Sequence, residues 1–310
     1  MSDLRRFKDG VPEDFNTPAS TPKDQEQASS WQESNRAWWE RNPMRYDFGD
    51  APVSATEGTR EFYEEIDRRF FRTAFESCPW AAVPFDTFIP FNDIRDKRVL
   101  EVGVGCGSHA QLLAPRSGRY VGIDLTSYAT ETTAARLALF GLPGGVIRMD
   151  AEHLGLATAT FDFVWSWGVI HHSSNTRAAL EEIHRVMRPG GTLVVMVYHR
   201  SFWNTVVRGG LYYGILRGGF LRGASVHRLL QETTDGAIAR YYSVGEWRAL
   251  VSDLFDVVEL RVLGHKTQLL PLPSGRLKTW LGSWIPGGIG RFVTNRPLMG
   301  YLLVTVLQKR

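Results

Sequence analysis

The stretch Val99-Leu100-Glu101-Val102-Gly103-Val104-Gly105-Cys106-Gly107 decides the fold of this chain of 310 residues. A short apolar run, rich in β-branched residues, ends at three glycines spaced two apart. This pattern is typical of a buried parallel strand that leads directly into a tight turn. Because glycine tolerates positive φ and has no Cβ, the backbone of such a turn can pass close to a ligand. We therefore expect an α/β sheet that begins here, with a ligand-binding turn after its first strand.

The spacing of the glycines distinguishes two kinds of nucleotide site. The dinucleotide fingerprint Gly-x-Gly-x-x-Gly fits Gly103 and Gly105, but its third glycine would fall at Ser108. An acid, Glu101, also stands two residues before the first glycine, and Asp124 ends the next apolar run. Together, these residues form a set: Glu101, Gly103, Gly105, Gly107 and Asp124. This set resembles the cofactor motifs of class I S-adenosylmethionine-dependent methyltransferases.

The resemblance runs from about residue 98 to residue 200, and more loosely to the C-terminus. Within it, Gly168-Val169-Ile170-His171-His172 and Arg188-Pro189-Gly190-Gly191 are similar to the subgroup that contains the ubiquinone and menaquinone biosynthesis methyltransferases. The resemblance implies a seven-stranded sheet whose last strand runs antiparallel to the others. It also implies S-adenosylmethionine as the cofactor and S-adenosylhomocysteine as the product.

The order of apolar runs and helical patterns predicts a Rossmann-like, doubly wound α/β sheet with right-handed crossovers. Strands are expected at 99–102, 120–125, 145–150, 161–167, 192–198, 256–263 and 299–307. Helices are expected at 59–77, 108–113, 127–141, 175–187 and 243–255.

Domain boundaries follow from changes in composition along the chain. Residues 1–30 are polar and hold few large apolar side chains, so we expect a mobile tail that cannot offset its ordering entropy. Residues 31–92 are expected to form an N-terminal helical lid, and residues 93–310 the methyltransferase domain implied by the resemblance. Residues 201–240 and 264–298 interrupt the alternation of strands and helices, and we expect acceptor-side insertions there.

Aromatic side chains crowd into the start of the expected lid. Trp31, Trp38 and Trp39 fall at helical spacing, and Pro43 ends the helix. One interpretation is an aromatic stripe packed on the core. The other is a lid that closes over the cofactor, in which Tyr46 presents a ring face to the cationic sulfonium.

The cofactor is expected beyond the carboxyl ends of the strands, where ligands of open α/β sheets bind. A carboxylate has two acceptor oxygens, so Asp124 can accept both ribose hydroxyls, although it could instead be a turn or helix-cap acid. By resemblance, Asp150 and the Ala151 amide recognise the adenine edge. The expected cofactor-binding residues are Tyr46, Glu101, Gly103, Val104, Gly105, Gly107, Asp124, Leu125, Asp150, Ala151, Glu152, Trp167, Gly168 and Val169.

Methyl transfer to a hydroxyl group or an acidic carbon requires a base. His171 and His172 follow the fourth expected strand and His199 follows the fifth, so all three are candidates, with His172 as the first choice. Each could also be a core histidine that is hydrogen-bonded to backbone. No cluster of His, Cys and Asp has the spacing of metal ligands, so we expect no metal.

The insertions are expected to select the acceptor. Residues 200–230 alternate large apolar side chains with arginines, which predicts a basic amphipathic segment, and residues 269–292 have a similar character. These segments could lie on an anionic membrane, roof a pocket for a long apolar substrate, or be ordinary lid elements folded on the sheet. Their aliphatic content favours a small lipophilic acceptor over RNA.

The overall composition limits the functional classes. The formal net charge is +3, which is not that of a nucleic-acid-binding polycation, and two cysteines give no disulfide framework. The N-terminus lacks the apolar region of a secretory signal, so we expect a cytoplasmic protein with at most peripheral contact with a membrane. The oligomeric state stays open.

The sequence thus favours a methyltransferase that acts on oxygen or carbon of a small, lipophilic metabolite. The alternative from another class is a non-catalytic accessory protein that binds the same cofactor or docks to a membrane. A nicotinamide-dependent oxidoreductase is disfavoured by Glu101 and Ser108.

Overall fold

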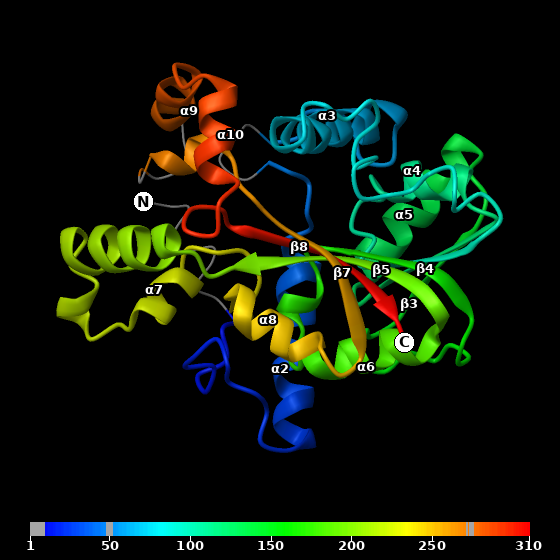
Figure 1. The fold of residues 1–310 in the computed structure, drawn as a ribbon, viewed down its shortest axis with the longest axis horizontal. Helices are drawn as coiled ribbons and strands as arrows, with labels where there is room; N and C mark the ends of the chain where they lie inside the picture. The colour runs from blue at the N-terminus through cyan, green and yellow to red at the C-terminus, as the bar shows by residue number, and fades with distance from the viewer. Residues whose placement is uncertain (1–9, 48–51, 271, 273–275) are drawn as a thin grey trace.

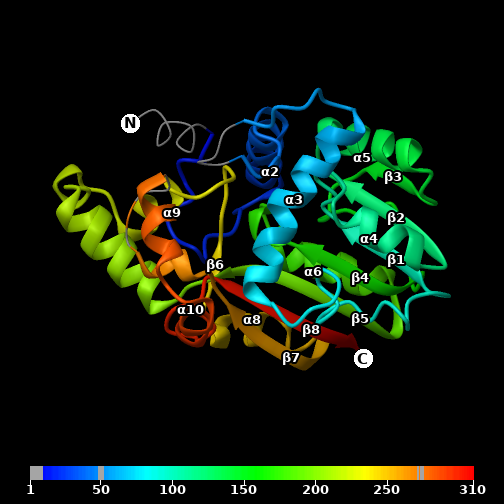
Figure 2. The same cartoon turned by 90° about the horizontal axis from the view of Figure 1, so that it is seen from above.

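The computed structural model describes residues 10–47, 52–270, 272 and 276–310. One mixed sheet lies at the centre of the molecule, between two layers of helices (Figure 1 and Figure 2). Its strands are β1 (Arg98–Val102), β2 (Arg119–Asp124), β3 (Gly145–Arg148), β4 (Phe161–Trp167), β5 (Met187–His199), β6 (Tyr241–Tyr242), β7 (Phe255–Leu263) and β8 (Leu302–Lys309).

Seven strands lie in the order β3-β2-β1-β4-β5-β8-β7, and the two-residue β6 pairs with the end of β5. β8 runs antiparallel to both of its neighbours, and the other strand pairs are parallel. The prediction of a doubly wound sheet with an antiparallel last strand is therefore confirmed. β6 was not expected, because two residues are too short for a recognisable strand pattern.

The helices of the described chain cover both faces of the sheet. The α-helices are α2 (Gln25–Arg41), α3 (Arg60–Ser77), α4 (Ala110–Leu113), α5 (Ser127–Phe140), α6 (Thr176–Val186), α7 (Val226–Gln231), α8 (Val244–Val251), α9 (Arg276–Ser283) and α10 (Gly287–Thr294). Four short 3-10 helices among the described residues are η1 (Ala114–Arg116), η2 (Ile170–His172), η4 (Phe220–Arg222) and η5 (Lys266–Leu269). The segment η3 (Trp203–Leu216) is a π-helix.

Alternate residues of the central strands pack into two separate hydrophobic cores, because successive side chains of a strand point to opposite faces of the sheet. Leu100 and Val164 pack beneath α6 and α8, whereas Val99 and Trp165 pack on the opposite face with α3, α4 and α5. Helices on both faces explain why these strands are largely apolar on both sides.

Several element ends differ from the prediction. α6 ends at Val186. β5 begins at Met187, five residues before the predicted start at Thr192. α8 has the expected capping box of Ser243 and Glu246, but ends at Val251 rather than Phe255, which begins β7.

The expectation of a mobile tail is wrong for residues 10–30, and residues 1–9 lie outside the described part. Phe15 is buried against Trp31, with ring centroids 5.6 Å apart, and against His227, at 4.9 Å. Asp24 caps α2, which therefore begins at Gln25 instead of near Trp31. One large aromatic anchor thus holds a segment whose overall composition is polar.

No helix in the described ranges is long and apolar enough to cross a bilayer.

Phe15→Ala is expected to lower the free energy of unfolding by about 3 kcal/mol, because it removes a buried ring from a packed cluster. Phe75, which is partly exposed on α3, provides the matched control, and Phe75→Ala is expected to cost less than about 1 kcal/mol. Urea unfolding of both variants measures the difference. Equal costs would contradict the anchoring role of Phe15.

Candidate functional site

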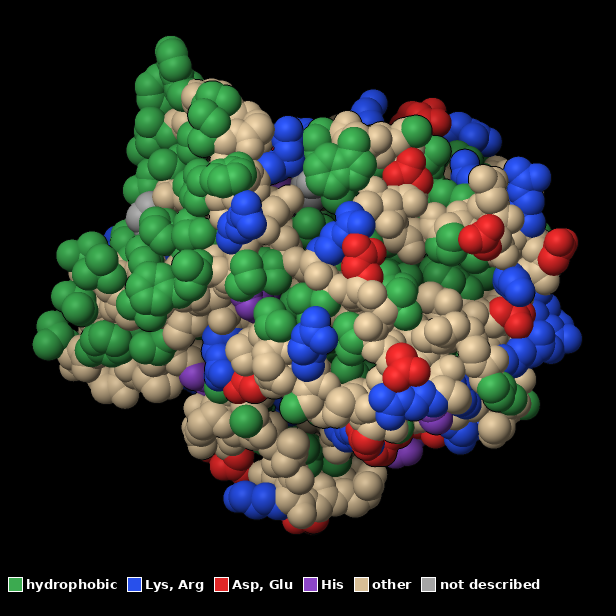
Figure 3. Space-filling model, in the orientation of Figure 1, with side chains coloured by type: hydrophobic (Ala, Val, Ile, Leu, Met, Phe, Trp, Pro, Cys, Tyr) green, Lys and Arg blue, Asp and Glu red, His purple; other side chains and the backbone are tan. Residues whose placement is uncertain are grey.

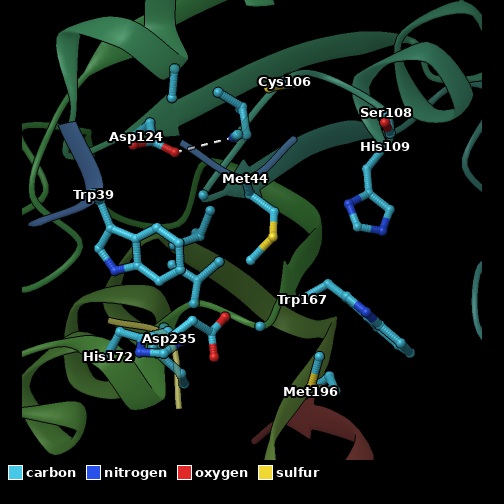
Figure 4. A pocket seen from close by; sticks show the side chains of 18 of the residues that line it. Trp39, Met44, Cys106, Ser108, His109, Asp124, Trp167, His172, Met196 and Asp235 are labelled. Atoms are coloured by element: carbon cyan, nitrogen blue, oxygen red, sulfur yellow. Dashed lines mark hydrogen bonds between the residues drawn. The ribbon is translucent and has the colours of Figure 1, made fainter. Parts of the chain in front are cut away.

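A cavity of about 520 Å³ lies at the carboxyl ends of β1, β2 and β4, under part of α2. Its volume is in the range of small-molecule sites, about 300–1,000 Å³. Figure 4 shows Asp124 at one end of the cavity, His172 and Asp235 at another, and Trp39 beside both. The switch point of the sheet, where the strand order reverses, is at this edge, as expected for an open α/β sheet.

The glycine loop after β1 requires glycine for two different reasons. Gly103 has a φ of +83°, and a Cβ there would lie 2.2 Å from a methyl carbon of Val169. Gly105 has a φ of +52°, but a Cβ there would have no neighbour within 4 Å. The first glycine therefore lets the loop pack on the segment after β4, while the second leaves open space at the cavity wall.

Asp124 both shapes this loop and lines the cavity. The Gly105 amide donates to its Oδ2 at 3.2 Å, and the amide and hydroxyl of Thr126 donate to its Oδ1 at 3.0 and 2.8 Å. Burial raises the pKa of the Asp124 carboxyl. The two interpretations of Asp124, a turn acid and a ligand-facing carboxylate, therefore do not exclude one another.

Asp150 and Ala151 line the cavity after β3, as predicted. Asp150 Oδ1 accepts a hydrogen bond from the side-chain Nε2 of Gln32 at 2.7 Å, and this bond connects α2 to the part of the site after β3. Glu152 lies outside the cavity lining, and its carboxylate accepts from the Ser174 hydroxyl and the Asn175 amide. In this structure the Glu152 oxygens therefore hold the turn before α6 rather than face the cavity.

Glu101 and Gly107 support the loop from beneath and do not line the cavity. The Tyr120 hydroxyl donates to Glu101 Oε2 at 2.7 Å, and full burial raises the Glu101 pKa to about 8. Gly107 faces Arg136 and Thr133, which a Cβ would approach to 2.9 and 3.1 Å. Of the two roles predicted for Glu101, the structure fits support of the loop.

The other predicted cofactor residues line the cavity: Tyr46, Val104, Leu125, Trp167, Gly168 and Val169. Tyr46 stacks on Phe70 with ring centroids 4.4 Å apart, and Trp167 stacks on Trp165 at 5.2 Å. In α2, Trp38 is buried in the core while Trp39 faces the cavity. The core stripe and the lid are therefore two faces of one helix.

His172 is the one predicted base that lines the cavity. Its Nδ1 lies 2.6 Å from the carbonyl oxygen of Ile238, so Nδ1 carries the proton of the neutral ring. Nε2 is buried and has no hydrogen-bond partner among the residues that the structure describes. Burial lowers the His172 pKa, which favours the neutral form with a free lone pair on Nε2.

The other two predicted bases, His171 and His199, have buried side chains that lie outside the cavity lining. The His199 Nδ1 lies 2.8 Å from the carbonyl oxygen of Gly300. The preceding residue, Tyr198, does line the cavity, since neighbouring side chains of a strand point to opposite faces. His171 packs between His172 and Tyr198, with ring centroids about 4 Å from each.

Asp235 was not predicted, although it lines the cavity beside His172. The Tyr198 hydroxyl donates to Asp235 Oδ1 at 2.7 Å, and the charge of Asp235 acts to raise the His172 pKa against the effect of burial. No local motif marks this residue, because it reaches the site from the loop after α7. The tertiary fold alone brings it there.

Comparison with known proteins supports the sequence resemblance. Residues 100–195 match a family described as a methyltransferase domain. The chain is 30% identical over 174 residues to a tRNA U34 carboxymethyltransferase of Methylococcus capsulatus, over 49% of this chain and 53% of that protein. It is 29% identical over 181 residues to a probable chloroplastic tocopherol O-methyltransferase of Oryza sativa, over 56% of this chain and 47% of that protein.

The chain spans about half the length of these curated relatives. A solved structure with a similar fold is the complex between the Haloferax volcanii Trm112 methyltransferase activator and a putative methyltransferase. The TM-score is 0.50 at 16% identity, and the match covers 78% of this chain and 93% of that chain. At this identity the likeness concerns the fold alone.

Alanine substitutions at Gly103 and Gly105 are expected to separate folding from binding. Gly103→Ala should lower the free energy of unfolding by about 2–4 kcal/mol, because the new methyl group collides with Val169 at a positive φ. Gly105→Ala should cost only about 1 kcal/mol, from its positive φ, yet weaken binding of the expected cofactor at least tenfold. Thermal unfolding and calorimetric titration measure the two effects, and a larger stability loss at Gly105 would contradict the assignment.

Glu101 is expected to make stability depend on pH. Its pKa in the folded protein, about 8, lies above the ordinary value of 4.5, so the folded state holds a proton that the unfolded state releases. Its contribution is complete below about pH 4.5 and is lost as the pH rises to about 8. Relative to Glu101→Gln, the wild-type protein should lose up to about 1.4 kcal/mol per pH unit in that window. Urea unfolding across the window tests this, and parallel pH profiles would refute it.

Proposed function

This chain belongs to the class I S-adenosylmethionine-dependent methyltransferases, and we propose that it transfers a methyl group to an oxygen or carbon atom of a small, lipophilic acceptor. The observation that carries the proposal is a single cavity whose parts differ chemically. The glycine loop and Asp124 lie at one end, the neutral His172 with Asp235 lies at another, and much of the remaining wall is apolar.

The residues at the first end fit the cofactor. The open space over Gly105 admits a ligand against the loop, and the Asp124 and Asp150 carboxylates offer acceptor oxygens for ribose hydroxyls and the adenine amino group. The ring faces of Tyr46 and Trp167 are suited to a cation near them. When bound, S-adenosylmethionine supplies a methyl group on a positively charged sulfur.

The remaining wall of the cavity favours an apolar acceptor. Away from the glycine loop, the cavity lining includes Phe85, Phe88, Met196 and Leu302. Burial also keeps His109 and His265, which line the same cavity, neutral by lowering their pKa values to about 3 and about 4. Such walls exclude water and align the acceptor, which are the main requirements for an in-line displacement. The tocopherol-acting relative supports an acceptor of this class. A lipophilic acceptor resides in a lipid phase, so the proposal includes peripheral contact of the protein with a membrane.

His172 is the proposed base. Its Nδ1–H donates to the Ile238 carbonyl oxygen, which fixes the tautomer and leaves the Nε2 lone pair to take a proton from the acceptor. The Asp235 carboxylate favours the imidazolium ion that results, and the Tyr198 hydroxyl holds that carboxylate in place. A positioning role is therefore proposed for Tyr198 and a charge-stabilising role for Asp235.

The test is turnover with acceptors of different classes. The protein is incubated with labelled S-adenosylmethionine and, separately, with a prenylated quinol, a tocopherol precursor, a long-chain fatty acid or bulk tRNA. Methylated product with at least one lipophilic acceptor is expected, together with stoichiometric S-adenosylhomocysteine. Methylation of tRNA alone would overturn the acceptor class, and binding of S-adenosylmethionine without turnover would favour the non-catalytic alternative.

His172→Gln is expected to lower kcat by a factor of about 100 to 10,000 while leaving the affinity for S-adenosylmethionine within about threefold. Asp235→Asn is expected to lower kcat less and to move the acidic limb of the pH–rate profile to lower pH. The sign follows because loss of the Asp235 charge lowers the His172 pKa, and the base must be unprotonated to act. An unchanged kcat in His172→Gln would remove this residue from the mechanism.

A further inference from the structure

Two segments, residues 200–231 in the first insertion and residues 264–298, carry most of the exposed large apolar side chains among the described residues. Eighteen large hydrophobic side chains are exposed among the described residues, and thirteen of them lie in residues 200–231 and 264–298, which make up 67 of the 310 residues. We call this the apolar surface. Leu221 is 93% exposed and Trp284 is 73% exposed. Scattered exposed leucines are ordinary, but a concentration of this kind marks an interaction site.

The apolar surface is continuous in space. Figure 3 shows hydrophobic side chains gathered over η3 on one side and over α9 and α10 above it. Trp203 joins the two insertions, since its indole Nε1 donates to the Gln268 carbonyl oxygen at 2.7 Å and its amide to that of Leu298 at 3.0 Å. The two segments therefore present one surface rather than two.

The charges of the same segments are of one sign. Residues 200–231 and 264–298 hold ten of the 36 lysines and arginines and none of the 33 aspartates and glutamates. The remainder of the chain has 26 basic and 33 acidic side chains, a formal charge of −7. Arg217, Arg222 and Arg296 are exposed within the surface. These two segments thus carry a net positive charge, whereas the remainder of the chain has a net negative charge.

We infer that the apolar surface docks on an anionic lipid bilayer. Exposed apolar side chains interspersed with arginine match the apolar and anionic layers of a membrane interface. Trp280 and Trp284 are suited to the headgroup level, where indole rings concentrate. A protein partner would need acidic groups distributed over a comparably large apolar face, whereas a bilayer supplies both features everywhere.

The alternative that these segments roof the substrate pocket is not supported. Of the two segments, His265 is the residue that lines the described cavity, and residues 200–231 contribute none. Asp235, which follows the first segment, lines the cavity but does not belong to the apolar surface. The second insertion instead begins at the cavity wall with His265 and ends next to Tyr301, which also lines it. On the proposed function, the docked surface would lie beside the route by which a lipophilic acceptor enters.

The experiment is co-sedimentation of the full chain with vesicles of phosphatidylcholine, with and without phosphatidylglycerol, at low and high salt. Binding is expected only with the anionic lipid and should weaken as salt screens the charges. Trp284→Glu should reduce vesicle partitioning at least tenfold. Trp80→Glu is the matched control, because Trp80 is 61% exposed outside both insertions, and it should change partitioning less than twofold. Arg217→Glu combined with Arg222→Glu gives a second, independent test.

Three results would overturn the inference: no binding to anionic vesicles, equal binding to neutral vesicles, or equal effects of Trp284→Glu and Trp80→Glu. Analytical ultracentrifugation of the same samples gives a fourth result that could overturn the inference. A dimer that Trp284→Glu dissociates, with no vesicle binding by either protein, would make this face a contact between two copies. Affinity for S-adenosylmethionine, measured by calorimetry, should be the same in all variants. Vesicle binding without cofactor binding would refute the proposed function and leave the docking surface standing.

Discussion

The hydrogen bond from the Gly105 amide to the Asp124 carboxylate joins the turn after β1 to the turn after β2, and the rest of the site depends on it. It holds the glycine loop open over the cavity at the switch point of the sheet. The loop reaches that position because Gly103 has no Cβ to collide with Val169. Two strand ends and the segment after β4 are thereby fixed around one space, and α2 closes it through Gln32 and Trp39.

The part of this arrangement that local sequence dictates was predictable. A β-branched run that ends in closely spaced glycines has few structural solutions, and the resemblance to the family implied an acid at the end of the next strand. Helix caps are equally local: Thr126 caps α5 and Asn175 caps α6, each at the start of a helix that the sequence predicts. The antiparallel β8 was available only from the family resemblance, because no periodicity in a strand reports its direction.

What depends on tertiary packing was not predictable. Asp235 reaches His172 from a loop after α7, with no motif to mark it. His199 has the position expected of a base, but strand alternation points Tyr198 into the cavity and turns His199 toward the Gly300 carbonyl oxygen. Phe15 shows how a single buried ring can order a segment whose composition predicts mobility. That residues 200–231 do not line the cavity likewise became visible only from the side-chain directions.

The most direct measurement is calorimetric titration of the purified protein with S-adenosylmethionine, S-adenosylhomocysteine and, separately, NADH. If the glycine loop and Asp124 hold a sulfonium nucleoside, the first two ligands bind with one site per chain and micromolar affinity, and NADH does not bind. Binding of NADH, or of none of the three, would contradict the assignment of the cavity on which the whole account rests.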